Sequence, residues 1–245
     1  MFFEVKELCR SFGALQAVNN VSFTLDEGTT LSIIGPNGAG KTTLFSVITG
    51  VFPPDRGEVM FKGTRVTGMP PDKLCHRGIA RSFQITNIFQ GLSVFENIRL
   101  ACQGRKATKR MFSHVSKLKE PMEETEKILD LLGLLDLRDR RAGTLSHGDQ
   151  RYLEIGMTLA AKPSLVLFDE PTAGMTPMET KATIELIRKL KGMVTIIIIE
   201  HDINMVFAVS DRILVMDQGN VLADGPPEEV KANEAVKAAY FGEEI

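Results

Sequence analysis

The sequence predicts an α/β fold built on a mainly parallel β-sheet. In the second half of the chain, short apolar runs alternate with helical patterns: SLVLF at 164–168, a helix over about 177–191, VTIIII at 194–199, a further helix, and ILVM at 213–216. Runs rich in Val and Ile that alternate with helices are typical of parallel strands covered by helices on both faces. The chain has 245 residues, enough for one large or two small domains.

Two further patterns complete the predicted fold. Residues 2–8 and 18–25 alternate apolar and polar side chains, which predicts antiparallel strands at the front of the chain. From 70 to 140 the sequence shifts towards helices and loops, with an amphipathic helix at 122–135, and the helical pattern continues to about Ala161. We therefore expect a helical region inserted between two parts of one α/β core.

Composition argues against several classes of protein. The 29 Lys and Arg nearly balance the 31 Asp and Glu, so no basic surface for nucleic acid is indicated. No apolar run approaches the ~20 residues of a membrane span, and the N-terminus has no cleavable signal pattern, so a cytoplasmic protein is expected. Cys9, Cys75 and Cys102 are odd in number and unclustered, which is typical of free thiols rather than disulfides or a zinc site.

A phosphate-binding loop is the most specific motif. GPNGAGKT at 35–42 matches G-x-x-x-x-G-K-[ST], with a strand pattern at 31–34 before it and a helix through Ile48 after it. Its glycines let backbone N–H groups approach phosphate oxygens, Lys41 can reach the β- and γ-phosphates, and the Thr42 hydroxyl can bind Mg²⁺. The predicted nucleotide contacts are Gly35, Pro36, Asn37, Gly38, Ala39, Gly40, Lys41, Thr42 and Thr43.

Acidic residues and a histidine follow two of the later strands. LVLFDEP at 165–171 ends a strand with Asp169 and Glu170, at the edge of a parallel sheet where ligands bind. Asp169 is expected to hold Mg²⁺ and Glu170 to polarise the attacking water. His201 follows the strand at 194–199, but a histidine alone at a strand end is more often structural, and spacing by itself favours that interpretation.

Five motifs in one order carry a family resemblance. GPNGAGKTT, Gln84 in ARSFQ, LSHGD at 145–149, LVLFDEP and IEHD make the chain resemble an ATP-binding-cassette (ABC) ATPase subunit over nearly its whole length. The resemblance implies a single P-loop NTPase domain over 1–245. In it, residues 1–84 and 162–245 form a RecA-like core with the antiparallel β-subdomain, and residues about 85–161 form the helical subdomain.

The resemblance also implies roles for individual residues. Gln84 would touch Mg²⁺ and the attacking water, with Thr42 and Asp169 as the other metal-binding residues. Glu170 would position water, and His201 would hold the γ-phosphate, which reverses the interpretation from spacing alone.

Three more nucleotide contacts follow from the resemblance. Ser146 and Gly148 would cap the γ-phosphate of the nucleotide on a second ATPase subunit, in a homo- or heterodimer. Phe12 stands where an aromatic ring stacks on adenine, although a place in the core is nearly as well supported by the sequence.

Within this family, the chain resembles the ATPases of importers for branched-chain amino acids, or their relatives for urea and short amides. This resemblance is the narrower one. It rests on RSFQITNIFQGLSVFENI at 81–98, EPTAGMTP at 170–177 and the tail at 227–243. Such a subunit hydrolyses ATP on the cytoplasmic face of the membrane, where it binds permease subunits. A periplasmic or extracellular solute-binding protein delivers the solute to the permease. Residues 84–97 would face the permease, with core packing as the alternative.

Three positions depart from the family pattern. The family signature is typically LSGGQ, whereas His147 and Asp149 occupy the positions of its first glycine and its glutamine. Thr176 stands where many members have an aspartate. These departures keep open a nucleotide-binding regulatory subunit with a weakened site. A soluble ABC ATPase without a transport role is a separate alternative, although such proteins usually join two cassettes or carry a long coiled-coil insertion, and this chain has neither.

Overall fold

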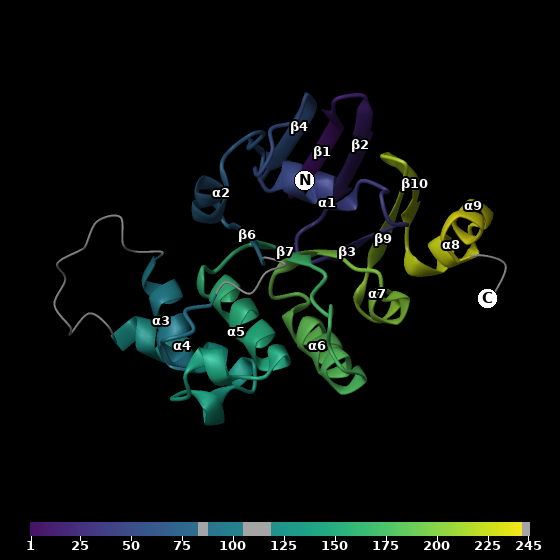
Figure 1. Ribbon diagram of the computed structural model, residues 1–245. Helices are drawn as coiled ribbons and strands as arrows, with labels where there is room; N and C mark the ends of the chain where they lie inside the picture. The colour runs from purple at the N-terminus through teal and green to yellow at the C-terminus, as the bar shows by residue number, and fades with distance from the viewer. Residues whose placement is uncertain (83–87, 105–118, 242–245) are drawn as a thin grey trace.

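Helix α1 (Lys41–Ile48) lies between two β-sheets (Figure 1). The structure is a computed structural model and describes residues 1–82, 88–104 and 119–241. The first sheet is antiparallel, with strand order β2-β1-β4-β5. Its front strands confirm the expected antiparallel pair at the N-terminus. The four strands are β1 (Phe3–Phe12), β2 (Leu15–Leu25), β4 (Arg56–Phe61) and β5 (Thr64–Arg65).

The second sheet has the order β10-β9-β3-β8-β7-β6 and is parallel except for β10 at one edge. It confirms the predicted mainly parallel sheet. The sequence did not predict the two edge strands, because β6 has only three residues and the apolar run of β10 is only three residues long. The six strands are β3 (Thr30–Ile34), β6 (Ile79–Arg81), β7 (Leu165–Asp169), β8 (Thr195–Ile199), β9 (Arg212–Asp217) and β10 (Asn220–Gly225).

Helices α3, α4 and α5 group together at one side of the parallel sheet, while α6 and α7 pack below it (Figure 1). Short 3-10 turns at Leu135–Leu137 and Ala142–Thr144 connect α4 to α5, and a π-helical turn, Lys237–Phe241, follows α9. The remaining helices are α2 (Pro71–Arg77), α3 (Val94–Gly104), α4 (Lys119–Leu131), α5 (His147–Ala160), α6 (Pro177–Leu190), α7 (Ile203–Val209), α8 (Pro227–Ala232) and α9 (Glu234–Val236).

The central strands are buried on both faces. In β8, Ile197 and Ile199 belong to the core shared with α1 and the antiparallel sheet, whereas Ile196 and Ile198 belong to the core shared with the helices on the opposite face. Successive side chains of a strand point to opposite faces, so a strand covered on both sides needs apolar residues at every position. This explains the unbroken isoleucine run that predicted the strand.

The predicted helix over 122–135 is wrong at both ends. Helix α4 begins at Lys119 and ends at Leu131. Pro121 falls in the first turn, where a backbone N–H has no intrahelical partner and a proline costs little. Gly133 adopts φ 68°, a left-handed conformation that ends the helix.

No helix in the described part of the chain combines the length and apolar character that a bilayer span needs. The three cysteines are free, with Cys9 and Cys102 buried and Cys75 exposed.

Gly156 lies where α3, α4 and α5 meet, and it allows the three helices to approach closely. A Cβ on Gly156 would lie 2.6 Å from Leu132 Cδ1 and 3.0 Å from Ile98 Cδ1. We predict that Gly156→Val overpacks this junction and lowers the free energy of unfolding by about 1–3 kcal/mol, measured by urea unfolding. Gly91→Val is the control, because a Cβ there meets nothing within 4 Å. Equal losses in the two variants would contradict the prediction.

Candidate active site

Two glycines of the phosphate loop are held between strands from opposite parts of the chain. A Cβ on Gly35 would lie 2.1 Å from the carbonyl oxygen of Met216 in β9, and a Cβ on Gly40 would lie 2.1 Å from that of Ala17 in β2. Any side chain would push these backbones apart. Gly38, by contrast, has no atom within 4 Å of where a Cβ would lie. Its φ of 82° is a left-handed backbone conformation, and this conformation is the reason that the position favours glycine.

The Lys41 ammonium group lies inside the loop. Nζ donates hydrogen bonds to the carbonyl oxygens of Gly35 at 2.6 Å and Pro36 at 3.0 Å. Burial lowers the pKa of Lys41, and the Glu170 carboxylate raises it in opposition. Helix α1 starts at this residue, and its N-cap, Gly40, provides no side-chain hydrogen bond. A helix N-terminus without a side-chain cap, beside an enclosed cation, is an arrangement that favours an anion.

Asp169 forms a buried ion pair that no sequence motif indicated. Its Oδ2 lies 2.7 Å from Arg81 Nη2, with the two side chains only 3% and 15% exposed. Arg81 also donates from Nη1 to Thr49 Oγ1 at the end of α1, and its guanidinium lies over the Phe45 ring, 5.0 Å from the centroid. Arg81 thus joins the strand-end carboxylate to the helix that carries the phosphate loop. The only sequence signal for it is a basic residue within a buried strand.

The oxygen donors near the loop fit a magnesium ion. The Asp169 carboxylate keeps its second oxygen outside the ion pair, and this oxygen accepts no hydrogen bond from the residues that the structure describes. Thr42 is exposed at the start of α1. A carboxylate and a hydroxyl are the ligand types that Mg²⁺ takes beside nucleotide phosphates. Gln84, the third predicted metal-binding residue, lies outside the described residues.

Glu170 and His201 face each other at the edge of the sheet. His201 Nδ1 lies 3.9 Å from Glu170 Oε1, so strand order brings together two residues that spacing alone left unconnected. Glu170 adopts φ 46°, unusual for a residue with a side chain, and its N–H donates to the carbonyl of Ile199 at 2.9 Å. Backbone strain of this kind is concentrated at functional sites.

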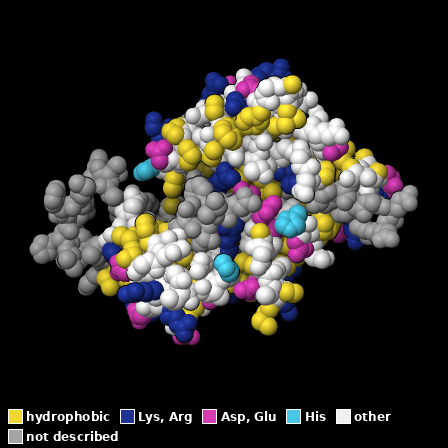
Figure 2. Space-filling view, in the orientation of Figure 1, with side chains coloured by type: hydrophobic (Ala, Val, Ile, Leu, Met, Phe, Trp, Pro, Cys, Tyr) yellow, Lys and Arg dark blue, Asp and Glu magenta, His cyan; other side chains and the backbone are white. Residues whose placement is uncertain are grey.

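Arg151 of α5 also reaches the end of β7. Its Nη2 donates to the carbonyl oxygens of Asp169 at 2.7 Å and Glu170 at 3.3 Å, and its Nη1 donates to Glu154 at 2.7 Å. Helix α5 is therefore fixed to the backbone that carries both acidic residues. Figure 2 shows acidic and basic side chains and histidines in the middle of this face, below a band of hydrophobic side chains.

Ser146 caps the start of α5. Its Oγ accepts from Asp149 N at 3.1 Å and donates to Asp149 Oδ2 at 2.8 Å. Ser146 is thus the N-cap of α5, and the carboxylate of Asp149, at the glutamine position of the signature, accepts from the Ser146 hydroxyl. His147 is exposed in the first turn of the same helix.

Thr176 and Glu179 form a capping box at the start of α6. The Glu179 carboxylate accepts from Thr176 N and Oγ1, both at 2.8 Å, and these bonds lower the pKa of Glu179, with a smaller contribution from His147. The T-x-x-E spacing of a capping box could have identified this pair in the sequence. The same carboxylate covers Gly148, where a Cβ would lie 2.3 Å from Glu179 Oε1.

Phe12 is 42% exposed and therefore does not belong to the core. Its ring packs edge-on against Phe52 with 5.6 Å between centroids, and the Arg10 guanidinium lies 5.0 Å from its centroid. An exposed ring of this kind remains available for stacking on a base.

A family model described as ABC transporter matches residues 18–173, more than half of the chain. The chain belongs to the ABC transporter family. It is therefore an ATP-binding cassette and an ATPase, a subunit type that binds ATP and ADP and associates with membrane transport subunits. A second family model, described as branched-chain amino acid ATP-binding cassette transporter, matches residues 220–245.

Named relatives cover nearly the whole cassette. It is 40% identical to the high-affinity branched-chain amino acid transport ATP-binding protein LivG of Salmonella typhimurium, over 98% of this chain and 97% of that protein. It is 39% identical to the corresponding protein BraF of Pseudomonas aeruginosa, with the same coverage of both chains. Among solved structures, it resembles an ATP-binding cassette of an ABC transporter in its ADP conformation, with a TM-score of 0.85, 32% identity and 99% coverage of both chains.

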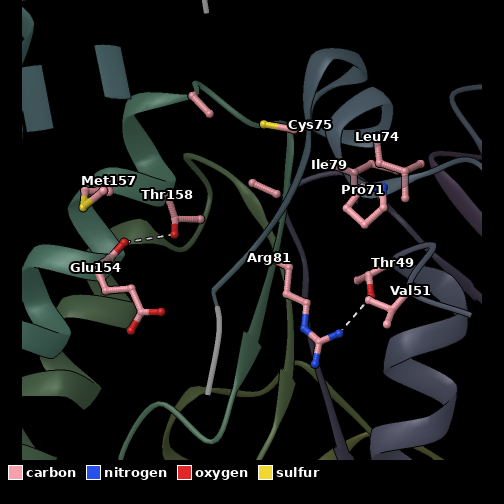
Figure 3. A pocket seen from close by; sticks show the side chains of 12 residues that line it. Thr49, Val51, Pro71, Leu74, Cys75, Ile79, Arg81, Glu154, Met157 and Thr158 are labelled. Carbon is pink, nitrogen blue, oxygen red and sulfur yellow. Dashed lines mark hydrogen bonds between the residues drawn. The ribbon is translucent and has the colours of Figure 1, made fainter. Parts of the chain in front are cut away.

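A pocket of about 250 Å³ opens beside the cassette's Arg81 (Figure 3). It lies between the end of α1, helix α2 and the second half of α5. Arg81 lines the pocket and donates a hydrogen bond to Thr49, which also lines it. The same guanidinium group forms the ion pair with Asp169, so Arg81 connects the pocket to that carboxylate. The lining is largely apolar and consists of Thr49, Val51, Pro71, Leu74, Cys75, Ile79, Ala80, Arg81, Glu154, Met157, Thr158 and Ala161.

We predict that Gly148→Ala displaces the Glu179 carboxylate and breaks the cap of α6 at Thr176. The melting temperature should fall in the otherwise unchanged chain. In a Glu179→Ala background the same substitution should raise it, because the clash is gone and alanine favours a helix over glycine. Thermal unfolding of the four proteins measures this coupling. The same shift in both backgrounds would show that Glu179 does not restrict position 148.

Proposed function

We propose that this cassette is the energy-coupling ATPase of an importer for branched-chain amino acids. The observation that carries the proposal is the near-complete alignment, at 39–40% identity, with LivG and BraF proteins named for this transport. The C-terminal match to a branched-chain family over residues 220–245 supports it independently. Both observations favour branched-chain amino acids over urea and short amides, and favour a transport role over a soluble one.

In the proposed reaction, the loop at 35–43 binds the ATP phosphates and Lys41 neutralises charge on the β- and γ-phosphates. Binding phosphate requires the ammonium to exchange its bonds to Gly35 and Pro36 for bonds to phosphate oxygens. Thr42, Asp169 and Gln84 would hold Mg²⁺, which supplies further positive charge to the phosphates. Phe12 would stack on the adenine.

The hydrolytic step is assigned to Glu170 and His201. Glu170 orients the attacking water and accepts its proton, while His201 holds the γ-phosphate from the adjacent loop. Their separation of 3.9 Å leaves both side chains facing one small region. The favourable geometry of these groups argues for an active subunit rather than a regulatory one, despite the altered signature.

A second cassette completes each site in this proposal. Residues about 85–161 would form the helical subdomain, which carries Ser146 and Gly148 to the nucleotide of the partner subunit, in a homo- or heterodimer. The N-terminus of α5 would then face the γ-phosphate, so ATP binds the closed dimer better than the open one. Hydrolysis removes the γ-phosphate and with it the free energy of closure.

The permease would bind at the pocket beside Arg81 and along the segment from 88 to 97. The Phe89 side chain is 54% exposed, although its backbone is fixed by the Asn97 amide. The Phe89 N–H donates to Asn97 Oδ1 at 2.8 Å, and Asn97 Nδ2 donates to the Phe89 carbonyl at 3.1 Å. Leu92 is also exposed, whereas Val94 and Phe95 are buried, so part of the predicted docking segment belongs to the core. Residues 84–87 of this segment lie outside the described residues. The cassette would sit at the cytoplasmic face of the membrane, with the solute-binding protein acting indirectly through the permease.

We predict that Glu170→Gln retains ATP binding but lowers turnover by about 100-fold or more, because the amide cannot accept a proton from water. Phosphate release and equilibrium binding of ATP measure the two properties. Glu185→Gln is the control, since Glu185 is an exposed glutamate paired with Arg188 on α6. Substantial hydrolysis in Glu170→Gln would remove Glu170 from the proposed role.

Deleting the gene for this cassette in its host tests the proposed solute. Uptake of labelled leucine, isoleucine and valine at low concentration should fall, and uptake of urea should not. Restoring the wild-type gene should restore uptake, and restoring Glu170→Gln should not. A defect limited to urea or a short amide would overturn the assignment of the solute but not of the ATPase.

A further inference from the structure

A carboxylate outside the predicted site residues is buried at the end of β8. Glu200 has none of its surface exposed, and it lies between the last residue of the strand and His201. A buried carboxylate is costly unless hydrogen-bond donors or a cation compensate for lost water. No Lys or Arg pairs with Glu200 among the residues that the structure describes, so the compensation comes from hydrogen bonds.

The two oxygens of Glu200 bind different loops. Oε1 accepts from the Thr172 backbone N–H at 3.1 Å and from the Thr172 hydroxyl. Oε2 accepts from the backbone N–H of His201 at 2.8 Å and, more weakly, from that of Asp202 at 3.4 Å. One carboxylate therefore connects the turn that follows Glu170 with the loop that carries His201.

The loops are also fixed on their far sides. Asp202 caps α7 by accepting from Asn204 N at 2.9 Å and Met205 N at 3.2 Å. The N–H of Glu170 donates to Ile199. Because these ends are fixed, the hydrogen bonds of Glu200 determine how far the two loops can move relative to each other.

The His201 ring lies between the two glutamates. Its Nδ1 is 3.5 Å from Glu200 Oε2 and 3.9 Å from Glu170 Oε1. The His201 side chain is 63% exposed, and the hydrogen bond that joins this residue to the buried carboxylate comes from its backbone N–H rather than from the ring.

We propose that Glu200 is a positioning residue for ATP hydrolysis, which holds His201 and the turn after Glu170 at a fixed separation. This role rests on the proposed function, because it matters only if Glu170 and His201 act on water and the γ-phosphate. Glu200 itself touches neither, since both its oxygens are occupied by protein donors. Its removal should therefore disturb the chemical step more than ATP binding.

Glu200→Gln tests the role. Glutamine has nearly the same volume, but its NH₂ group replaces one carboxylate oxygen and would face the backbone N–H groups that now donate to that oxygen. In the full-length cassette we expect kcat to fall about 10- to 100-fold, while KM and the Kd for ATP change less than about threefold. In a His201→Ala background, the same substitution should lower kcat by a smaller factor than in the wild-type chain, because only the turn after Glu170 then remains for Glu200 to position. Fully multiplicative losses, or a rise in KM with unchanged kcat, would overturn the proposal.

Thr172 provides a second pair of variants that leaves the charge of Glu200 unchanged. Thr172→Ser keeps both donors to Oε1 and should retain kcat, whereas Thr172→Val keeps the shape, loses the hydroxyl and should lower kcat severalfold. Equal kcat in the two variants would contradict the proposal even if Glu200→Gln fails to fold. Cooperative thermal unfolding of each variant identifies those that are folded.

The single variants Glu170→Gln and His201→Ala separate failure of this inference from failure of the proposed function. Full turnover in both would refute the catalytic roles on which the inference rests. Loss of turnover in both, with normal kcat in Glu200→Gln and Thr172→Val, would refute only the role of Glu200.

Discussion

The parallel pairing of β7 with β8 is the interaction on which the site depends. Asp169 pairs with Ile199 in this register, so the residues that follow each strand, Glu170 and Glu200, emerge at the same edge of the sheet. Both strands are buried on both faces by apolar side chains, which leaves the strands little freedom to shift. A slip of one residue would separate Glu170 from His201 and exchange the faces of every core side chain in the strand.

Several charged groups at this edge have protein partners. Arg81 pairs with Asp169, Arg151 pairs with Glu154, backbone donors surround Glu200, and Lys41 binds the carbonyls of its own loop. Unpaired buried charges would be expensive, so these pairings compensate for the burial of the charges. ATP must then exchange existing contacts for its own, and the Lys41 contacts are the ones that lie where phosphates are expected.

The parts of the site that the sequence predicts are those defined by local spacing. The loop at 35–42 is such a motif, because its neighbours in the chain are also its neighbours in space, and the strand ends at Asp169 and His201 follow from hydrophobic runs. Arg81 and Glu200 have no such signal, since their partners Asp169 and Thr172 lie 88 and 28 residues away in the chain. Pairing over such distances depends on strand order, which residue patterns do not specify.

The departures at Asp149 and Thr176 have a shared physical basis. Both residues take part in hydrogen bonds at the start of a helix: Asp149 bonds to the N-cap Ser146, and Thr176 forms a capping box with Glu179. Each substitution therefore preserves the start of a helix while it changes the polar groups presented to a partner subunit. At α5 this has a consequence for closure, because the Ser146 hydroxyl that would meet the partner's γ-phosphate is already donated to a carboxylate. Phosphate must displace Asp149 from that hydroxyl against like charge, whereas a neutral glutamine would impose no such repulsion. In the proposed dimer, the altered signature would therefore keep the geometry of the helix start and weaken the electrostatic part of the contact between the subunits.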